Sequence, residues 1–163
     1  MNKIFDMVET SKISAEYNGS LIVADCKAKT VLENGRFAVA DLVKKVAEYG
    51  TDAKADVYLI DGVEKLYNDE GLTSFCNAAD KEVRLIKLLQ GDVIITTALD
   101  EAMLEKKTGK ITGVKAGDKV VVTKDGRLTK SMDVKDAKFF ATVLEVTSLY
   151  YGSVPAIKIV VGC

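Results

Sequence analysis

The sequence predicts a mainly β protein, built as a single-domain β-barrel or β-sandwich with one or two short helices. Runs rich in Val, Ile and Leu recur at spacings of about a dozen residues, as strands do in such folds. Gly-Asp, Asp-Gly and Asn-Gly steps separate the runs and favour tight turns. With 163 residues, 48% of them hydrophobic, the chain is long enough to bury one core.

The sequence of residues 1–19 predicts an N-terminal arm. Residues 1–19 carry a few apolar side chains, followed by the polar stretch ETSKISAEYNG. We expect residues 1–19 to form an N-terminal arm that orders on a partner, and residues 20–163 to form the β-rich domain. The alternative is a terminus that contains one edge strand. The apolar side chains that the arm would offer to its partner are Ile4, Phe5, Met7 and Val8.

The strongest hairpin signal is the Asn34-Gly35 step, which lies between two β-rich runs. Both residue types tolerate the positive φ of a type I′ turn, so we expect a hairpin here. Further strands are predicted in ADVYLIDG and EVRLIKLLQGDVIITTALD. We expect strands 119–123 and 127–130 to pair across a Lys-Asp-Gly turn, and a last hairpin to turn near Gly152.

One helix is predicted, over ADLVKKVAEYG. Asp41 would be its N-cap, and Gly50 follows its end. Leu42, Val43 and Val46 would share one face of this helix of about three turns. Such a short helix needs packing against a sheet to persist.

The composition excludes several function classes from our expectations. Lys and Arg number 23 against 24 Asp and Glu, so the net charge of -1 lacks the basic excess typical of nucleic-acid binding. The chain has no histidine, and its cysteines, Cys26, Cys76 and Cys163, form no C-x-x-C pair. Because histidine is the commonest proton-transfer group and metal ligand, we expect no catalytic residues, no cofactor and no metal site.

The N-terminus gives no sign of export. The segment MNKIFDMVETSKISAEYNG lacks the long apolar core of a signal peptide, and no apolar run reaches the length of a membrane span. We therefore expect synthesis in the cytoplasm and no contact with a membrane.

Three sets of polar residues are candidates for a site. The carboxylates of LYNDEG lack the alternation of a calcium loop, so we interpret them as a solvated turn. Lys135 and Lys138 precede a strand, and with KAGDKV upstream they resemble a lipoyl or biotinyl carrier, in which a turn presents one modified lysine, but the modification signature of that family is absent. Arg36, Arg84 and Arg127 would form an anion site if the fold brought them together.

Tyr150 and Tyr151 form the one tight pair among the tyrosines. Adjacent residues of a strand face opposite sides, so we expect one ring to pack inward and the other to face solvent or a partner. Tyrosine is enriched at protein interfaces because its ring is large and its hydroxyl is polar. Both residues are therefore candidates for partner binding.

Four stretches set the order of the β elements: VLENGRFAV, then DVYLIDGVEKLYNDEGLTSFCNAADKEVRLIKLLQGDVIITT, then AGDKVVVTKDGRL, then AKFFATVLEV and a closing strand. This order, from about Thr30 to the C-terminus, resembles the small β-rich accessory head proteins of tailed bacteriophages, which decorate or cement the capsid. The resemblance implies a non-enzymatic structural protein on the capsid surface of the virion. Its partners would be the phage major capsid protein and neighbouring copies of itself, in a homo-oligomer.

Two other function classes are kept open. A tail, connector or fibre-base protein of a phage would share the β core but would assemble into rings or trimers. A carrier or small-ligand-binding β-barrel protein would carry a modified lysine or a bound cofactor. Images of the native particle would separate the first class from a capsid protein, and the intact mass would reveal the second.

Overall fold

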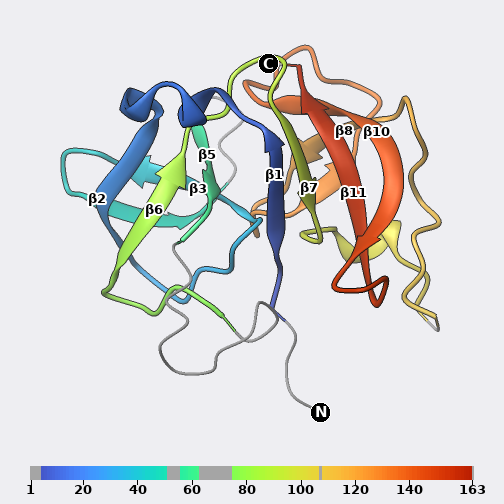
Figure 1. Cartoon of the computed structure of the whole chain (residues 1–163), viewed down its shortest axis with the longest axis horizontal. Coiled ribbons are helices and arrows are strands. Elements are labelled where there is room, and N and C mark those ends of the chain that lie inside the picture. The colour runs from blue at the N-terminus through green and yellow to red at the C-terminus, as the bar shows by residue number, and fades with distance from the viewer. Residues whose placement is uncertain (1–4, 51–55, 63–74, 107, 163) are drawn as a thin grey trace.

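The computed structural model describes residues 5–50, 56–62, 75–106 and 108–162. These residues form two β assemblies that lie beside one another (Figure 1). One is a closed barrel with the strand order β2-β4-β3-β5-β6, and the other is a six-stranded sheet with the order β1-β7-β11-β10-β8-β9. The prediction of a mainly β fold with a barrel and only short helices is confirmed.

Apolar side chains fill the barrel. Its strands are β2 (Ile22–Ala28), β3 (Phe37–Asp41), β4 (Val46–Tyr49), β5 (Val57–Ile60) and β6 (Glu82–Ile86). Neighbouring strands are antiparallel, except β2 and β4, which are parallel. Because strand side chains alternate between two faces, every second one points into the barrel. The buried set includes Cys26, Ala28, Leu32, Ala38, Ala47, Ile60, Val83 and Leu85.

The six-stranded sheet contains the predicted C-terminal hairpins. Its strands are β1 (Val8–Lys12), β7 (Val93–Thr96), β8 (Lys119–Val122), β9 (Leu128–Lys130), β10 (Phe140–Leu149) and β11 (Val154–Val161). β8 pairs with β9 and β10 pairs with β11, so both hairpin predictions are confirmed. Pro155 is the second residue of β11, where a missing N–H is tolerated.

One apolar cluster joins the two assemblies. The rings of Phe37 from the barrel and Phe139 from the segment before β10 lie with their centroids 4.9 Å apart. Full burial of a large apolar side chain contributes about 1.5–3 kcal/mol, so this shared cluster makes the barrel and the sheet one unit. Other members are Leu59 and Ile86 from the barrel, and Ile94, Val120, Ile157 and Ile159 from the sheet.

Helical structure among the described residues is limited to single 3-10 turns. These are η1 (Ser14–Glu16), η2 (Gly19–Leu21) and η4 (Glu101–Met103). Asp100 caps η4, because its carboxylate accepts the N–H of Ala102 at 2.9 Å. In this described part of the chain, no helix has the length and apolarity needed to cross a membrane.

The helix predicted over ADLVKKVAEYG is wrong, because β3 and β4 form an antiparallel hairpin there. The carboxylate of Asp41 accepts the N–H groups of Val43 and Lys44 at 3.1 and 2.9 Å, and Lys45 has a φ of 56°. An N-cap makes the same kind of hydrogen bond, but here it closes a turn. Leu42 and Val43, expected on a packed face, are 53% and 94% exposed.

The two-residue hairpin predicted at Asn34-Gly35 is also wrong. The preceding strand β2 pairs with β4 and β6, and the following strand β3 pairs with β4 and β5. Only Gly35 has a positive φ, of 79°, whereas a type I′ turn requires it at both positions. Asn34 uses its amide instead: its Oδ1 accepts the N–H of Gly62 at 2.8 Å, and its Nδ2 donates to the Gly62 carbonyl at 3.1 Å.

The N-terminal segment differs from the arm that we expected over residues 1–19. Residues 8–12 form β1, which pairs antiparallel with β7 and lies between the barrel and the rest of the sheet in Figure 1. Met7 and Ile13, on either side of β1, are each only 5% exposed. Over its described part, the segment is therefore the edge strand of the alternative interpretation, because β1 ends the strand order of the sheet.

Candidate binding surface

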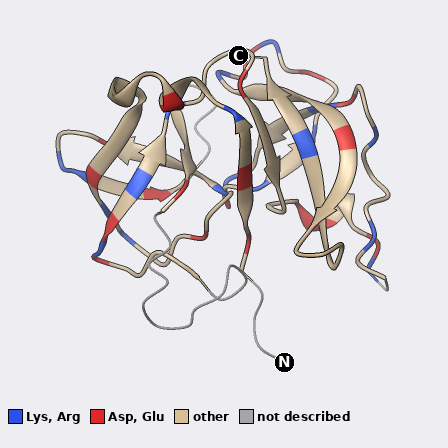
Figure 2. Ribbon diagram, in the orientation of Figure 1, with Lys and Arg blue, Asp and Glu red and all other residues tan. Residues whose placement is uncertain are grey.

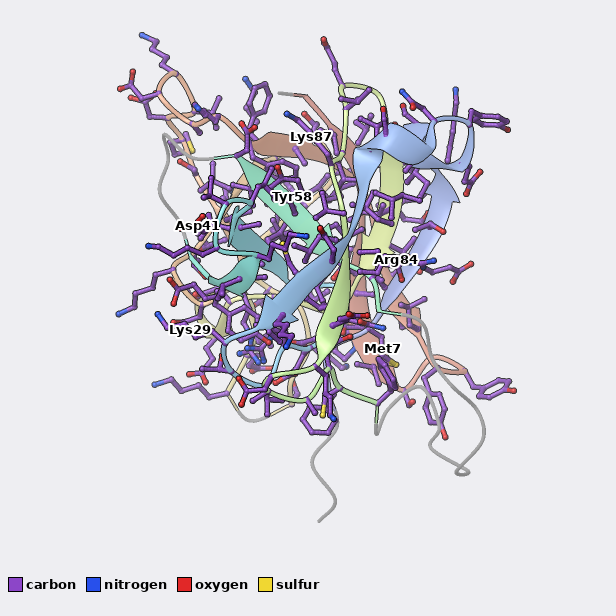
Figure 3. The ribbon with its side chains drawn as sticks, turned by 90° about the vertical axis from the view of Figure 1, so that its left-hand side faces the viewer. Met7, Lys29, Asp41, Tyr58, Arg84 and Lys87 are labelled. Carbon is purple, nitrogen blue, oxygen red and sulfur yellow. The ribbon has the colours of Figure 1, made fainter. Side chains whose placement is uncertain are left out.

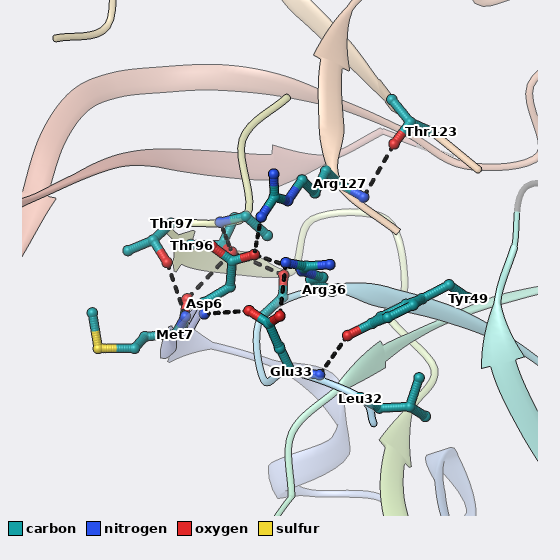
Figure 4. Close-up of polar contacts among 12 residues, drawn as sticks. Asp6, Met7, Leu32, Glu33, Arg36, Tyr49, Thr96, Thr97, Thr123 and Arg127 are labelled. Carbon is teal, nitrogen blue, oxygen red and sulfur yellow. Dashed lines mark hydrogen bonds and ion pairs between the residues drawn. The ribbon is translucent and has the colours of Figure 1, made fainter. Parts of the chain in front are cut away.

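A buried group of charged side chains lies where the N-terminal segment, the barrel and the β8-β9 hairpin meet (Figure 4). The Nε atom of Arg36 lies 2.5 Å from Oδ2 of Asp6, and its Nη2 lies 2.9 Å from Oε1 of Glu33. Nη2 of Arg127 lies 3.3 Å from the same Asp6 oxygen. The side chains of Arg36 and Asp6 are only 11% and 14% exposed. We call these four residues the Asp6 cluster.

Burial and ion pairing act in opposite directions on the pKa values of this cluster. Burial raises the pKa of Asp6 above its usual value, against the opposing effect of Arg36 and Arg127. Burial also acts to lower the pKa of Arg36, but the ion pair and hydrogen bond with Asp6 raise it. Burial raises the pKa of Tyr49 to about 12. The Tyr49 hydroxyl stays protonated near neutral pH and accepts the N–H of Glu33 at 2.6 Å.

Hydrogen bonds hold the backbone of the same segment in place. The N–H of Met7 donates to Oγ1 of Thr97 at 2.8 Å, and the N–H of Thr97 donates to the Met7 carbonyl at 3.1 Å. Oγ1 of Thr96 donates to the carbonyl of Gly35 at 2.9 Å. A side chain at position 35 would collide with the Met7 carbonyl, so this position requires glycine for its space as well as its φ. The N-terminal segment is thus an integral part of the fold.

The three arginines proposed as an anion site do not form one site. Arg36 and Arg127 do come together, but the anion between them is the carboxylate of Asp6. Arg84 is engaged elsewhere, with its Nη2 2.6 Å from Oδ2 of Asp61. The Asp6 cluster therefore neutralises its own charges and joins distant segments of the chain.

Among the described residues, the most exposed aromatic side chains that lie together are at the turn between β10 and β11. Tyr150 and Tyr151 have φ values of 52° and 55°, and their ring centroids lie 5.7 Å apart in an edge-to-face arrangement. Tyr151 is fully exposed, and Tyr150 is 47% exposed. The N–H and Oγ of Ser153 both donate to the Tyr150 carbonyl, at 3.1 and 2.6 Å. The expected inward packing of one ring is wrong, because the pair lies in a turn. We call Tyr150 and Tyr151 the tyrosine tip.

Charged residues of both signs are interspersed along the ribbon of the described chain (Figure 2). Several form exposed pairs, such as Lys29 and Glu48, whose Nζ and Oε2 lie 2.6 Å apart. Lys29 and Asp41 are both labelled on the barrel side in Figure 3, and Asp41 pairs with Lys44 at 3.4 Å. Such pairs contribute little stability and create no large field of one sign.

The predicted partner-binding residues are divided by the fold. Phe5 is half-buried, Met7 is buried, and Val8 packs against the shared core. Ile4 lies outside the described residues. The apolar side chains of this segment that are described therefore contribute to the chain's own packing, whereas the tyrosine tip faces solvent.

The remaining candidates have ordinary surroundings or cannot be placed. LYNDEG and Cys163 lie outside the described residues. Burial raises the pKa of the Cys26 thiol, which makes it less reactive. Nζ of Lys138 lies 3.9 Å from Oδ1 of Asp56, as expected for a solubilising surface charge. Buried apolar side chains from the described strands of the barrel pack against one another.

The Asp6 cluster was not predicted from the sequence. Its members come from three segments that are far apart in the sequence, so they form no recognisable sequence motif. One signal was available: Asp6 lies between the apolar residues Phe5 and Met7, and Arg36 precedes Phe37. A charge inside an apolar run is unexpected in a core and implies a buried partner of opposite sign.

Comparisons of this chain with protein-family models, with curated proteins and with solved structures found no match.

Proposed function

We propose that this protein is a non-enzymatic structural protein that decorates and stabilises the assembled capsid of a tailed bacteriophage. The tyrosine tip is the observation that carries the proposal, since it presents two aromatic rings to solvent on a folded β body. The order of β elements, which resembles that of phage accessory head proteins, supports the same function. The partners are the major capsid protein and neighbouring copies of this chain on the virion surface.

The tip is suited to act as a preorganised anchor. A left-handed conformation costs a non-glycine residue about 1–2 kcal/mol, and strain of this kind gathers at binding sites. The hydrogen bonds from Ser153 hold the strained turn in place. Because the turn is already ordered, binding loses little conformational entropy, and aromatic rings are frequent energetic centres of interfaces.

Stabilisation of the capsid follows from mass action. A protein that binds the assembled shell, and not its free subunits, shifts the equilibrium toward the shell. Contacts that bridge neighbouring capsid subunits have this property, because the bridged surface exists only after assembly. The mechanism requires no reaction and no cofactor.

The test is a co-sedimentation assay with empty shells of the phage that encodes this chain. The double variant Tyr150→Asn/Tyr151→Asn removes both rings, and asparagine tolerates the left-handed conformation. We expect its affinity for shells to fall by about tenfold or more. The matched control is Tyr17→Asn, at the residue that follows η1, where the tyrosine is 89% exposed; it should bind like the wild type.

Two results would count against the proposal. If the double variant occupies shells as well as the wild type does, the tyrosine tip is not the anchor. If negative-stain images show the wild-type protein on tails or connectors and not on capsids, the protein belongs to another part of the virion.

A further inference from the structure

β10 is longer than its neighbour β8 and therefore has an open edge. It runs from Phe140 to Leu149, but its pairing with β8 covers only residues 140–142. Hydrogen bonds from Gly117 and to Asp118 extend this contact as far as Val143. Beyond Val143, β11 is the only strand paired with β10 in the described part of the chain. Residues 144–149 form what we call the open edge.

The register shows which backbone groups face outward at this edge. In an antiparallel pair, residues alternate between exchanging hydrogen bonds with the partner strand and facing away from it. Ser148 lies opposite Pro155, which has no N–H, so Ser148 belongs to the second kind. Val146, two residues earlier, belongs to it as well. Their N–H and C=O groups therefore point away from β11, and no backbone hydrogen bond joins them to another described segment.

The open edge lacks the lysine and proline that often prevent a free strand from pairing with another chain. Here the sequence of the edge is LEVTSL, and Leu144 and Val146 are 45% and 41% exposed. The register of β10 against β11 shifts between Val143 and Glu145, where pairing with β8 has ended, and the tyrosine tip follows the end of β10 directly. The edge is thus continuous with the anchor proposed above.

A groove of about 420 Å³ runs along this part of β10. Figure 1 shows the chain between η4 and β8 passing on the side of β10 that faces away from β11. Residues of this segment line the groove, so a chain that pairs with the open edge would lie between this segment and β10. The groove is lined on one side by Thr108, Lys110 and Ile111, and on the other by Val146, Ser148 and Ser153.

We propose that the open edge of β10 receives an extended segment of the capsid subunit as an added strand. The inference rests on the proposed function and names the part of the partner that binds. Unpaired N–H and C=O groups in a row select an extended main chain, and the neighbouring hydroxyl and apolar side chains select small or apolar residues. The tyrosine tip then anchors one end of the added strand.

The first measurement uses the isolated protein and does not depend on the proposed function. Amide hydrogen exchange at single-residue resolution should show fast exchange at Val146 and Ser148, and slow exchange at Thr147, which bonds to β11. Slow exchange at Val146 and Ser148 in the dilute protein would overturn the inference, since the edge would already be covered. Protection that grows with concentration, together with a dimeric mass, would assign the edge to a second copy and would also overturn it.

The second measurement uses empty shells of the encoding phage. Val146→Pro removes one outward N–H, and Val146→Thr is the matched control that keeps it. We expect Val146→Pro to reduce shell occupancy at least tenfold and Val146→Thr to leave it unchanged, with Val146 and Ser148 becoming protected on wild-type shells. Circular dichroism checks that Val146→Pro is folded. If this variant is unfolded, amide protection of Val146 and Ser148 in the shell-bound wild-type protein decides whether a strand is added.

The outcomes separate the two proposals. Wild-type binding without protection at Val146 and Ser148 overturns strand addition and leaves capsid decoration standing. If folded Val146→Pro occupies the shells as well as the wild type does, strand addition is likewise overturned and capsid decoration is left standing. If the wild-type protein does not bind shells at all, the proposed function fails and strand addition by the capsid subunit fails with it.

Discussion

The Nε atom of Arg36 lies 2.5 Å from Oδ2 of Asp6, although the two residues are 30 positions apart in the sequence. Arg127 brings a second cation to the same oxygen. A buried charge is tolerated only while its partners are present, because otherwise its lost hydration is not compensated. One carboxylate therefore couples the N-terminal segment, the barrel and the β8-β9 hairpin.

Removal of the central arginine should be strongly destabilising. Arg36→Met leaves Asp6 and Glu33 buried near one another with less positive charge, and we expect a loss of about 3–5 kcal/mol in the free energy of unfolding. Urea denaturation measures this loss. The control is Lys29→Met, in an exposed pair with Glu48, and it should change stability by no more than about 1 kcal/mol. Similar losses in both variants would contradict the buried role of Arg36.

Stability should also depend on pH through Asp6. Burial raises its pKa in the folded protein above the usual 3.8, so the folded state binds this proton more tightly than the unfolded state. That contribution is fully present below pH 3.8 and is lost as the pH rises through the folded pKa. The comparison is with Asp6→Asn, by denaturation at a series of pH values. The free energy of unfolding of the wild type, relative to the variant, should fall as the pH rises through this window; a rise would show that the arginines outweigh burial.

A second loss of stability is expected at high pH, because the pKa of Tyr49 is raised in the folded protein. Its pKa rises from 10.0 to about 12 on folding, so its contribution is present below pH 10 and disappears as the pH approaches 12. Near neutral pH, Tyr49→Phe should cost about 1–3 kcal/mol, because the buried N–H of Glu33 loses its acceptor. Denaturation of Tyr49→Phe measures the cost near neutral pH, and ultraviolet titration of the wild type tests the raised pKa of Tyr49. The control Tyr17→Phe, at an exposed site, should leave the free energy of unfolding unchanged.

The fold was predictable where a local signal was enough. The β8-β9 hairpin turns at Gly126, whose φ is 72°, and an Asp-Gly step favours a turn whatever its surroundings. At Asp41 the local signal is ambiguous, because a side chain that accepts the following N–H groups begins a helix or closes a turn equally well. The pairing of β3 with β5 decides between a helix and a turn, and this pairing cannot be predicted from the residues around Asp41 alone.

The candidate surface was predictable only in part. The adjacent rings of Tyr150 and Tyr151 are visible in the sequence, but their exposure depends on where β10 ends. The open edge depends on the relative lengths of β8 and β10 once they are paired. The contact of Asp6 with Arg36 depends on the path of the whole chain between them, so no spacing rule reveals it.

Truncation tests the place of the N-terminal segment. Deletion of residues 2–13 removes β1, Asp6 and the buried side chains of Met7 and Ile13. It leaves one edge of β7 unpaired and the Asp6 cluster incomplete, so we expect the isolated domain to unfold or to melt at a much lower temperature. Circular dichroism with a thermal scan measures the change. A melting temperature equal to that of the full chain would restore the interpretation of this segment as an arm.

Alanine substitutions at two glycines with similar φ angles distinguish the cost of left-handed backbone strain from the cost of a steric clash. Gly35 and Gly91 have φ values of 79° and 91°. A Cβ atom at Gly91 would meet nothing within 4 Å, whereas at Gly35 it would collide with the Met7 carbonyl and lie 2.9 Å from Oγ1 of Thr96. Gly91→Ala should therefore cost only the left-handed strain, about 1–2 kcal/mol, and Gly35→Ala about 1–3 kcal/mol more, because the backbone at Met7 must move. Guanidinium denaturation of both variants gives the difference directly. Equal losses would mean that the N-terminal segment yields without resistance, and that the hydrogen bonds around Met7 do not hold it as firmly as their geometry indicates.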